Sequence, residues 1–129
     1  MAPQVTPYAV LVSWLEFWGA PILMIAISVA YFLASDRAAG VVKRAAWSSH
    51  GAMAAVIYFG AVVVWIAGLS RSSWGSAFLI LQLLPLALII YSLICFRGNR
   101  LVHFLQVPNA LAMVWGMLVG GMAATGDWL

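Results

Sequence analysis

Four long hydrophobic runs cover most of the chain, and they predict four helices that cross a membrane. None of the four contains a lysine or an arginine, and Glu16 is their only acidic residue. Each is long enough to span about 30 Å of hydrocarbon at about 1.5 Å per residue. We therefore expect an all-α fold, a single transmembrane domain over residues 1–129 in which two hairpins form a four-helix bundle. The expected spans are residues 8–33, 50–69, 74–96 and 103–126.

Within the last span, small and polar residues recur at the spacing of one helix face, and large apolar residues occupy the other faces. Gly116 and Gly120 form the Gly-x-x-x-Gly pattern that lets two helix backbones approach closely in lipid. Another helix of the same chain is the simpler occupant of this face, and a helix of a different protein is the alternative. In the second case, the partner-binding residues are Asn109, Ala112, Gly116, Gly120, Ala123 and Asp127.

The composition supports a lipid environment and argues against most enzyme classes. The chain is 66% hydrophobic and 7% charged, and a soluble domain of this size cannot bury so much apolar surface. The predicted spans leave no room for a folded soluble domain. The sequence contains no Ser–His–Asp set, metal-ligand spacing, phosphate-binding glycine loop or basic nucleic-acid surface. We therefore expect no enzymatic activity, no metal or other cofactor, and no nucleic-acid partner.

The basic residues between the spans predict the orientation of the chain. Five of the six Lys and Arg residues lie in the loops after the first and third spans, and only Arg71 lies in the loop after the second. Because cytoplasmic loops carry an excess of Lys and Arg, both basic loops are expected inside and both termini outside. The first loop, residues 34–49, is also long enough for a short helix on the membrane surface.

Two polar residues, Glu16 in the first span and Gln82 in the third, are expected to be buried at similar depths near the outer side. A carboxylate at this depth must be protonated, paired or exposed to a water-filled cavity. Glu16 is thus either a structural hydrogen-bonding group or the proton- or cation-binding residue of a transporter. In the same span, Pro21 cannot donate to the Phe17 carbonyl and is expected to kink the helix.

The transporter interpretation is accompanied by a resemblance in layout. Four short spans with one glutamate in the first are similar to the small multidrug resistance transporters, which implies an oligomer built around Glu16. The chain departs from that family because the glycine-rich pattern of the third span is missing. Its first loop is also longer than the family's.

Two histidines are the candidate ligands for a cofactor. His50 and His103 lie at the inner ends of the second and fourth spans, and such a pair could ligate the iron of haem b in a membrane complex. The run Phe104-x-x-Val107-Pro108 is similar to the last span of the HemJ-type haem-pathway membrane proteins. The first span lacks that family's histidine, however. The alternative is two interfacial histidines beside basic loops, and we expect no bound haem.

The chain as a whole has a few short spans, compact basic loops and no soluble domain. In this layout it resembles the membrane-embedded immunity proteins that protect bacteria from pore-forming toxins of rivals, including those delivered by colicins and type VI secretion. The resemblance implies a protein of the bacterial inner membrane that acts through helix–helix contact with a toxin. Toxin contact is then expected within residues 103–128, and the chain could also form a homo-oligomer.

Overall fold

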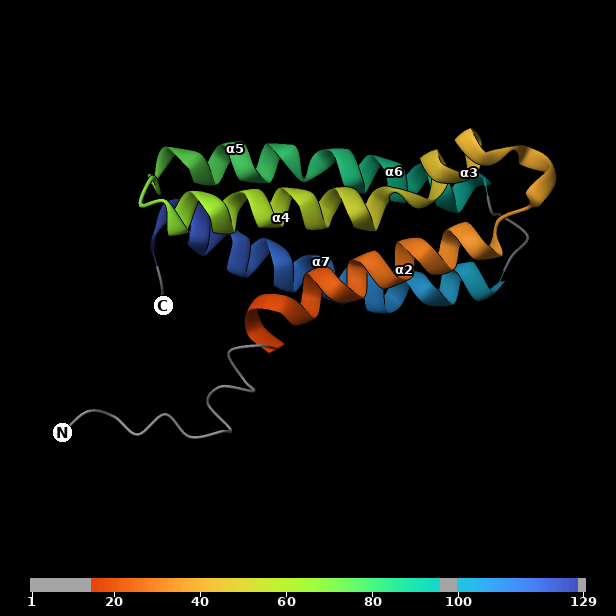
Figure 1. Ribbon diagram of the computed structural model, residues 1–129, viewed down its shortest axis with the longest axis horizontal. Helices are drawn as coiled ribbons and strands as arrows, with labels where there is room; N and C mark the ends of the chain where they lie inside the picture. The colour runs from red at the N-terminus through yellow and green to blue at the C-terminus, as the bar shows by residue number, and fades with distance from the viewer. Residues whose placement is uncertain (1–14, 96–99, 128–129) are drawn as a thin grey trace.

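The computed structural model describes residues 15–95 and 100–127, apart from the side chains of residues 15, 16, 101 and 102. Over these residues the chain forms helices and no strand. The longer helices run side by side along the long axis of the molecule (Figure 1). The elements are η1 Leu15–Gly19 (a π-helical turn), α2 Ala20–Ala34, η2 Arg37–Ala39 (a 3₁₀ turn), α3 Val41–Ser48, α4 His50–Ile66, α5 Ser73–Leu81, α6 Leu83–Cys95 and α7 Arg100–Thr125.

Three helical segments are long and apolar enough to cross a membrane, namely Phe17–Ala34, Ser73–Cys95 and His103–Thr125. α3 and α4 meet the same requirement only as a pair, and they are bent by 54° at the break between them. α4 by itself has 17 residues, so it is shorter than the predicted span of residues 50–69. It ends early because Gly68 has a φ of 68°, a left-handed conformation that terminates helices. Residues 8–14 of the first predicted span lie outside the described residues.

α7 packs against α2, α4 and α5. The contacts between these helices are lined largely by alanines and glycines, whereas many large apolar side chains point outward. Leu33, Ile66 and Leu111 are examples, with 71%, 75% and 69% of their surfaces exposed. This distribution is typical of helices that associate in lipid, because lipid solvates large apolar residues and small ones permit close approach.

α2 and α4 touch through their backbones. A Cβ atom on Gly51 would lie 2.1 Å from the Met24 carbonyl oxygen, so only glycine fits at this crossing. Beside it, the Ser28 hydroxyl accepts a hydrogen bond of 2.9 Å from the backbone N–H of Ala52. Ala52 belongs to the first turn of α4, whose amides lack partners within their own helix. α2 therefore caps the start of α4.

The first span is irregular where the sequence predicts a disruption. Pro21 has no N–H to donate to the Phe17 carbonyl, and the chain forms the π-helical turn η1 just before it. The Tyr58 hydroxyl of α4 donates to this carbonyl at 2.7 Å. A cross-helix hydrogen bond thus reaches the carbonyl to which Pro21 cannot donate.

The short helix predicted in the first loop is present as α3. Arg44 ties it to α2, because Nε donates to Ser35 Oγ and Nη2 donates to the Phe32 carbonyl, both at 2.8 Å. The Ser92 hydroxyl of α6 donates to the Trp47 carbonyl at the other end of α3. These hydrogen bonds hold α3 at an angle to α4.

At the opposite end of the bundle, the turn between α4 and α5 is joined to the end of α7. Ser70 Oγ donates to the Ala123 carbonyl at 2.8 Å, and the backbone N–H of Arg71 donates to the Ala124 carbonyl at 3.1 Å. The last carbonyls of a helix have no partners within it, so the turn caps α7.

Candidate functional site

The small-residue face of α7 is covered by other helices of the same chain. Its buried members are Asn109, Ala112, Gly116, Gly120 and Ala123. A Cβ atom on Gly116 would lie 3.3 Å from Met24 Cε of α2, and one on Gly120 would lie 2.5 Å from Phe78 Cζ of α5. The two glycines therefore make room for side chains of α2 and α5.

This arrangement matches the simpler of the two occupants considered for that face, a helix of the same chain. Five of the six residues predicted to bind a partner lie inside the bundle, so they are not accessible to a partner in this structure. Asp127 is the exception, because it is exposed beyond the end of α7. Its contact with a partner stays a prediction.

Gln82 is buried as predicted, with 3% of its surface exposed. It lies at the break between α5 and α6, so the third predicted span consists of two helices. Pro85 is also buried and has no N–H to donate to the Leu81 carbonyl, which explains the break. Glu16 lies in η1, but its side chain is outside the described residues. Its burial and its partners therefore stay predictions.

A polar cluster occupies the core near α3, and it joins α2, α4 and α7. Asn109 Nδ2 donates to Gln106 Oε1 at 2.9 Å, and Gln106 Nε2 lies 3.4 Å from His50 Nε2. The Tyr31 phenol hydrogen-bonds the Gln106 side chain. The Tyr31 ring also meets the imidazole edge-on, with ring centroids 4.8 Å apart. Three helices thus share one group of polar contacts.

Tyr31, His50 and Asn109 are completely buried in this cluster. The imidazole accepts from the Gln106 amide when it is neutral and its proton is on Nδ1. Among the described residues, His50 Nδ1 and Asn109 Oδ1 make no hydrogen bond of normal geometry, although the Trp47 carbonyl lies beside the imidazole. Interhelical polar contacts of this kind fix the register of helices in lipid.

The sequence indicates His50 as a candidate haem ligand and Asn109 as a candidate partner-binding residue, and it does not predict that they belong to one cluster. His50 and Gln106 are 56 residues apart, so no local pattern joins them. The pattern that could have paired them is their depth along the spans. His50 and Gln106 both lie in the halves of their spans that adjoin the predicted basic loops. A search for polar residues at equal depth on different spans would have paired them.

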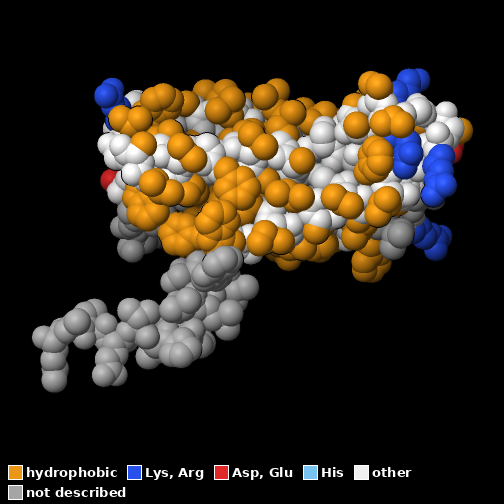
Figure 2. Space-filling view, viewed as in Figure 1, with side chains coloured by type: hydrophobic (Ala, Val, Ile, Leu, Met, Phe, Trp, Pro, Cys, Tyr) orange, Lys and Arg blue, Asp and Glu red, His pale blue; other side chains and the backbone are white. Residues whose placement is uncertain are grey.

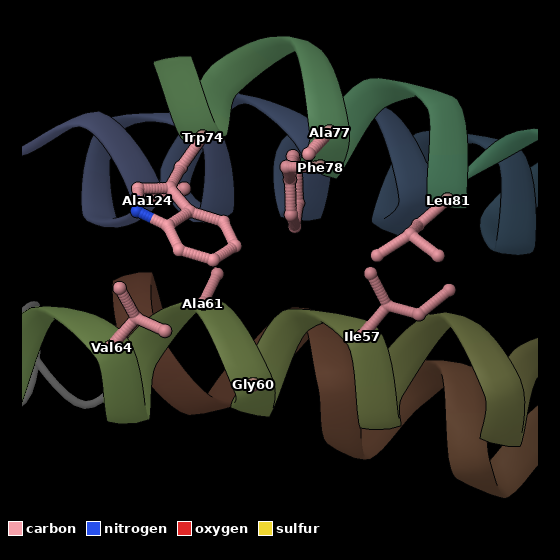
Figure 3. Close-up of a pocket in the computed structure, with 9 residues that line it drawn as sticks. All are labelled: Ile57, Gly60, Ala61, Val64, Trp74, Ala77, Phe78, Leu81 and Ala124. Atoms are coloured by element: carbon pink, nitrogen blue, oxygen red, sulfur yellow. The ribbon is translucent and has the colours of Figure 1, made fainter. Parts of the chain in front are cut away.

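An apolar groove with a volume of about 240 Å³ opens between α4 and α5 in the other half of the molecule (Figure 3). In Figure 3, Ile57 and Val64 of α4 point across it toward Leu81 and Trp74 of α5, and α7 lies behind. Its remaining lining residues are Gly60, Ala61, Ala77, Phe78 and Ala124.

Gly60 distinguishes this groove from the tight helix contacts of the bundle. A Cβ atom built on Gly60 would meet no atom within 4 Å, whereas one on Gly51 would overlap the backbone of α2. Gly60 is therefore an exposed small residue on the edge of the groove, whereas Ala61 beside it is buried and Ala77 is half-buried. No pattern in the sequence predicted this open position.

The two histidines differ in their surroundings. His50 is enclosed in the polar cluster, with Gln106 and Tyr31 against its ring, whereas His103 is exposed on α7. Two axial ligands of one haem must present ring nitrogens to a common site. This arrangement gives the haem interpretation no support.

Comparison of the chain with protein-family models, with curated proteins and with solved structures found no match.

Proposed function

We propose that the chain is a four-span protein of the bacterial inner membrane, a bundle of two transmembrane hairpins with both termini outside. Apolar side chains cover the middle of the molecule in Figure 2, and most of the Lys and Arg side chains in view gather at the end where α3 lies. Three helical segments are long and apolar enough for three of the spans, and α4, which meets this requirement together with α3, would be the fourth, with α3 at the membrane surface. The positive-inside rule then assigns the α3 end to the cytoplasm.

Reporter fusions test this orientation. A reporter fused after Leu129 should report the outer side, and one inserted at Gly98 should report the cytoplasm. A cytoplasmic signal from the fusion after Leu129 would contradict the proposed orientation. Recovery of the protein in the soluble fraction would contradict the membrane location.

In this setting, the proposed function is immunity against a pore-forming toxin, by capture of one of the toxin's apolar helices. The observation that carries the proposal is the apolar groove between α4 and α5 with the exposed Gly60 at its edge. The hydrophobic effect does not drive association within lipid, so a helix is bound through close packing, for which glycine and alanine are suited. The buried glycines of α7 already serve this purpose inside the bundle, and Gly60 presents the same chemistry outward.

The dimensions and position of the groove suit a helix that arrives from outside. From Ile57 to Val64 the groove follows about 10 Å of α4, or about two helical turns. It lies in the half of the molecule that ends in the turn between α4 and α5, which is the outer half in the proposed orientation. A toxin that inserts from outside would meet this half first.

The test compares two glycine variants, Gly60→Leu and Gly121→Leu. Both glycines lie within helices, and a Cβ atom on either would meet nothing within 4 Å. Only Gly60 lines the groove. In cells exposed to a pore-forming toxin encoded beside this gene, we expect Gly60→Leu to abolish protection at normal membrane abundance, and Gly121→Leu to preserve both.

Survival, membrane potential and abundance are measured together. Full protection by Gly60→Leu would exclude the groove as the toxin site. A cross-link from position 60 to a second copy of the chain, rather than to the toxin, would make the groove an oligomer interface. If deletion of the protein leaves the membrane potential unchanged during toxin exposure, immunity itself is excluded.

A further inference from the structure

A second groove runs along the outside of α2, where the break between α3 and α4 meets it. Its volume is also about 240 Å³. Ile25, Val29 and Phe32 of α2 line it together with Ala45 of α3 and Ala52 of α4, and its remaining lining residues are Ser28, Ser48 and Ser49. The three α2 residues are spaced by four and three positions, so they lie on one face over about 10 Å. These three residues therefore form an apolar strip of the groove that runs parallel to α2, and we call this strip the channel.

A fixed guanidinium lies at one end of this channel. The Arg44 guanidinium stacks over the Phe32 ring, with its central carbon 4.4 Å from the ring centroid. Nε and Nη2 donate to Ser35 Oγ and to the Phe32 carbonyl. An arginine has five N–H donors, so these two bonds leave three for another acceptor. Among the described residues, Arg44 has no ion pair with a carboxylate.

The segment around Arg44 carries a positive charge. Residues 36–44 contain three basic side chains and one acid, which gives a net charge of +2. The acid, Asp36, accepts a hydrogen bond from the backbone N–H of Ala38, and Arg37 and Lys43 are exposed. This end of the molecule carries most of the Lys and Arg side chains visible in Figure 2.

α3 also exposes apolar residues beside these charges. Val41 and Val42 are 67% and 83% exposed, and Lys43 follows them directly. A short helix with apolar and basic faces is typical of segments that lie in the headgroup region of a membrane. The channel, the guanidinium and α3 therefore meet at one place, where a lipid headgroup and its acyl chain would also meet.

We propose that this groove binds an anionic phospholipid of the cytoplasmic leaflet. One acyl chain lies along α2 between Ile25 and Phe32, and Arg44 and Lys43 bind the phosphate. The inference rests on the membrane location and orientation given under Proposed function, and it does not depend on toxin binding. The groove on α2 is thus proposed as a lipid site, whereas the groove at Gly60 is proposed as the site for a toxin helix.

The first experiment tests selectivity for the headgroup. The purified chain is equilibrated with mixed micelles of phosphatidylglycerol and phosphatidylcholine, and the retained lipids are counted by native mass spectrometry. We expect preferential retention of phosphatidylglycerol. Lys43→Gln should reduce that preference about fivefold, the factor expected for one basic residue near an anionic surface. Arg71→Gln, at the other end of the bundle, is the matched control and should leave the preference unchanged.

The second experiment tests the channel. Val29→Phe fills the groove, and Val63→Phe places the same side chain on α4 outside it; the two valines are 52% and 63% exposed. Val29→Phe should abolish retention of the tightly held lipid, and Val63→Phe should preserve it. Arg44 is left unchanged in both variants because it also holds α3 against α2.

Three results would overturn the proposal. These are equal retention of the two lipids by the unmodified chain, an equal loss in Val29→Phe and Val63→Phe, and displacement of the lipid by inorganic phosphate alone. Selective retention together with failed protection from the toxin would contradict only the immunity function. Protection without selective retention would contradict only the lipid site.

Discussion

The two ends of α4 are packed differently. At the end next to α3, the backbones of α2 and α4 touch at Gly51, and the polar cluster around Gln106 joins α2, α4 and α7. At the end next to the turn between α4 and α5, the same helix α4 turns Gly60 toward an apolar groove. One helix therefore contributes to a closed contact at its start and to an open surface in its second half.

The difference shows which contacts fix the arrangement of the helices and which part of the bundle stays open to a partner. Polar contacts and backbone crossings at the α3 end define one register for the helices, because few other arrangements satisfy them. The other half can then leave Gly60 and the groove beside it open without loss of register.

The largest effect is expected from Gly51→Ala. Its added Cβ would lie 2.1 Å from a backbone oxygen of α2, so the helices themselves must move apart. We expect the free energy of unfolding to fall by about 3 kcal/mol, the upper part of the range for overpacking. Unfolding in mixed detergent micelles measures this effect.

Gly60→Ala is the matched variant at the open end. No atom lies within 4 Å of the added Cβ, so the change should stabilise α4 by up to about 1 kcal/mol through helix propensity. Similar losses of stability in Gly51→Ala and Gly60→Ala would show that the two ends are equally closed, against our interpretation.

A smaller loss is expected from Gly120→Leu, in the last turns of α7. The atom nearest to the added Cβ is Phe78 Cζ, the far end of a side chain that can rotate. We expect a loss of about 2 kcal/mol in the free energy of unfolding and a lower abundance in the membrane. Gly121→Leu is the control and should change neither quantity. Normal stability of Gly120→Leu would indicate that this face of α7 is not packed within the bundle.

Asn109→Leu tests the polar cluster. It removes the donor to Gln106 Oε1 and also a buried oxygen that has no partner among the described residues. The two effects partly offset each other, so we expect a loss of about 1 kcal/mol in the free energy of unfolding. Ala110→Leu, on the exposed side of α7, should be neutral. A stabilised Asn109→Leu variant would mean that the cluster costs more than it contributes.

The smallest effect is expected from Tyr58→Phe. This change removes the hydrogen bond to the Phe17 carbonyl, and such bonds between helices in lipid contribute about 0.6 kcal/mol on average. Tyr91→Phe, at an exposed position, is the control for loss of a hydroxyl group. Equal unfolding free energies for the two variants would show that the π-helical turn needs no support from α4.

Local signals in the sequence predicted the helices and several of their irregularities. A proline removes a defined amide, so the disturbance before Pro21 follows from the sequence, and the helix in residues 34–49 follows from length and pattern. The small-residue face of α7 was found by its spacing, but spacing does not say which helix covers it. That question is decided by the three-dimensional arrangement, which placed Met24 and Phe78 there.

The polar cluster and the groove at Gly60 could not be predicted in the same way. The cluster depends on the relative depth of residues in α2, α4 and α7. The groove depends on how far α4 and α5 separate after the turn that joins them, and Gly60 carries no side chain that would indicate a contact or its absence. Each feature is a property of helix pairs, whereas periodicity describes one helix at a time.

The contacts of α7 with three other helices have a consequence for biosynthesis. α7 packs against α2, α4 and α5, and it receives the hydrogen bonds of Ser70 and Arg71 at its end. It is also the last of the described helices to leave the ribosome. The surfaces of α2, α4 and α5 that contact α7 therefore stay uncovered until this helix is made, and the cap formed by Ser70 and Arg71 is completed only then.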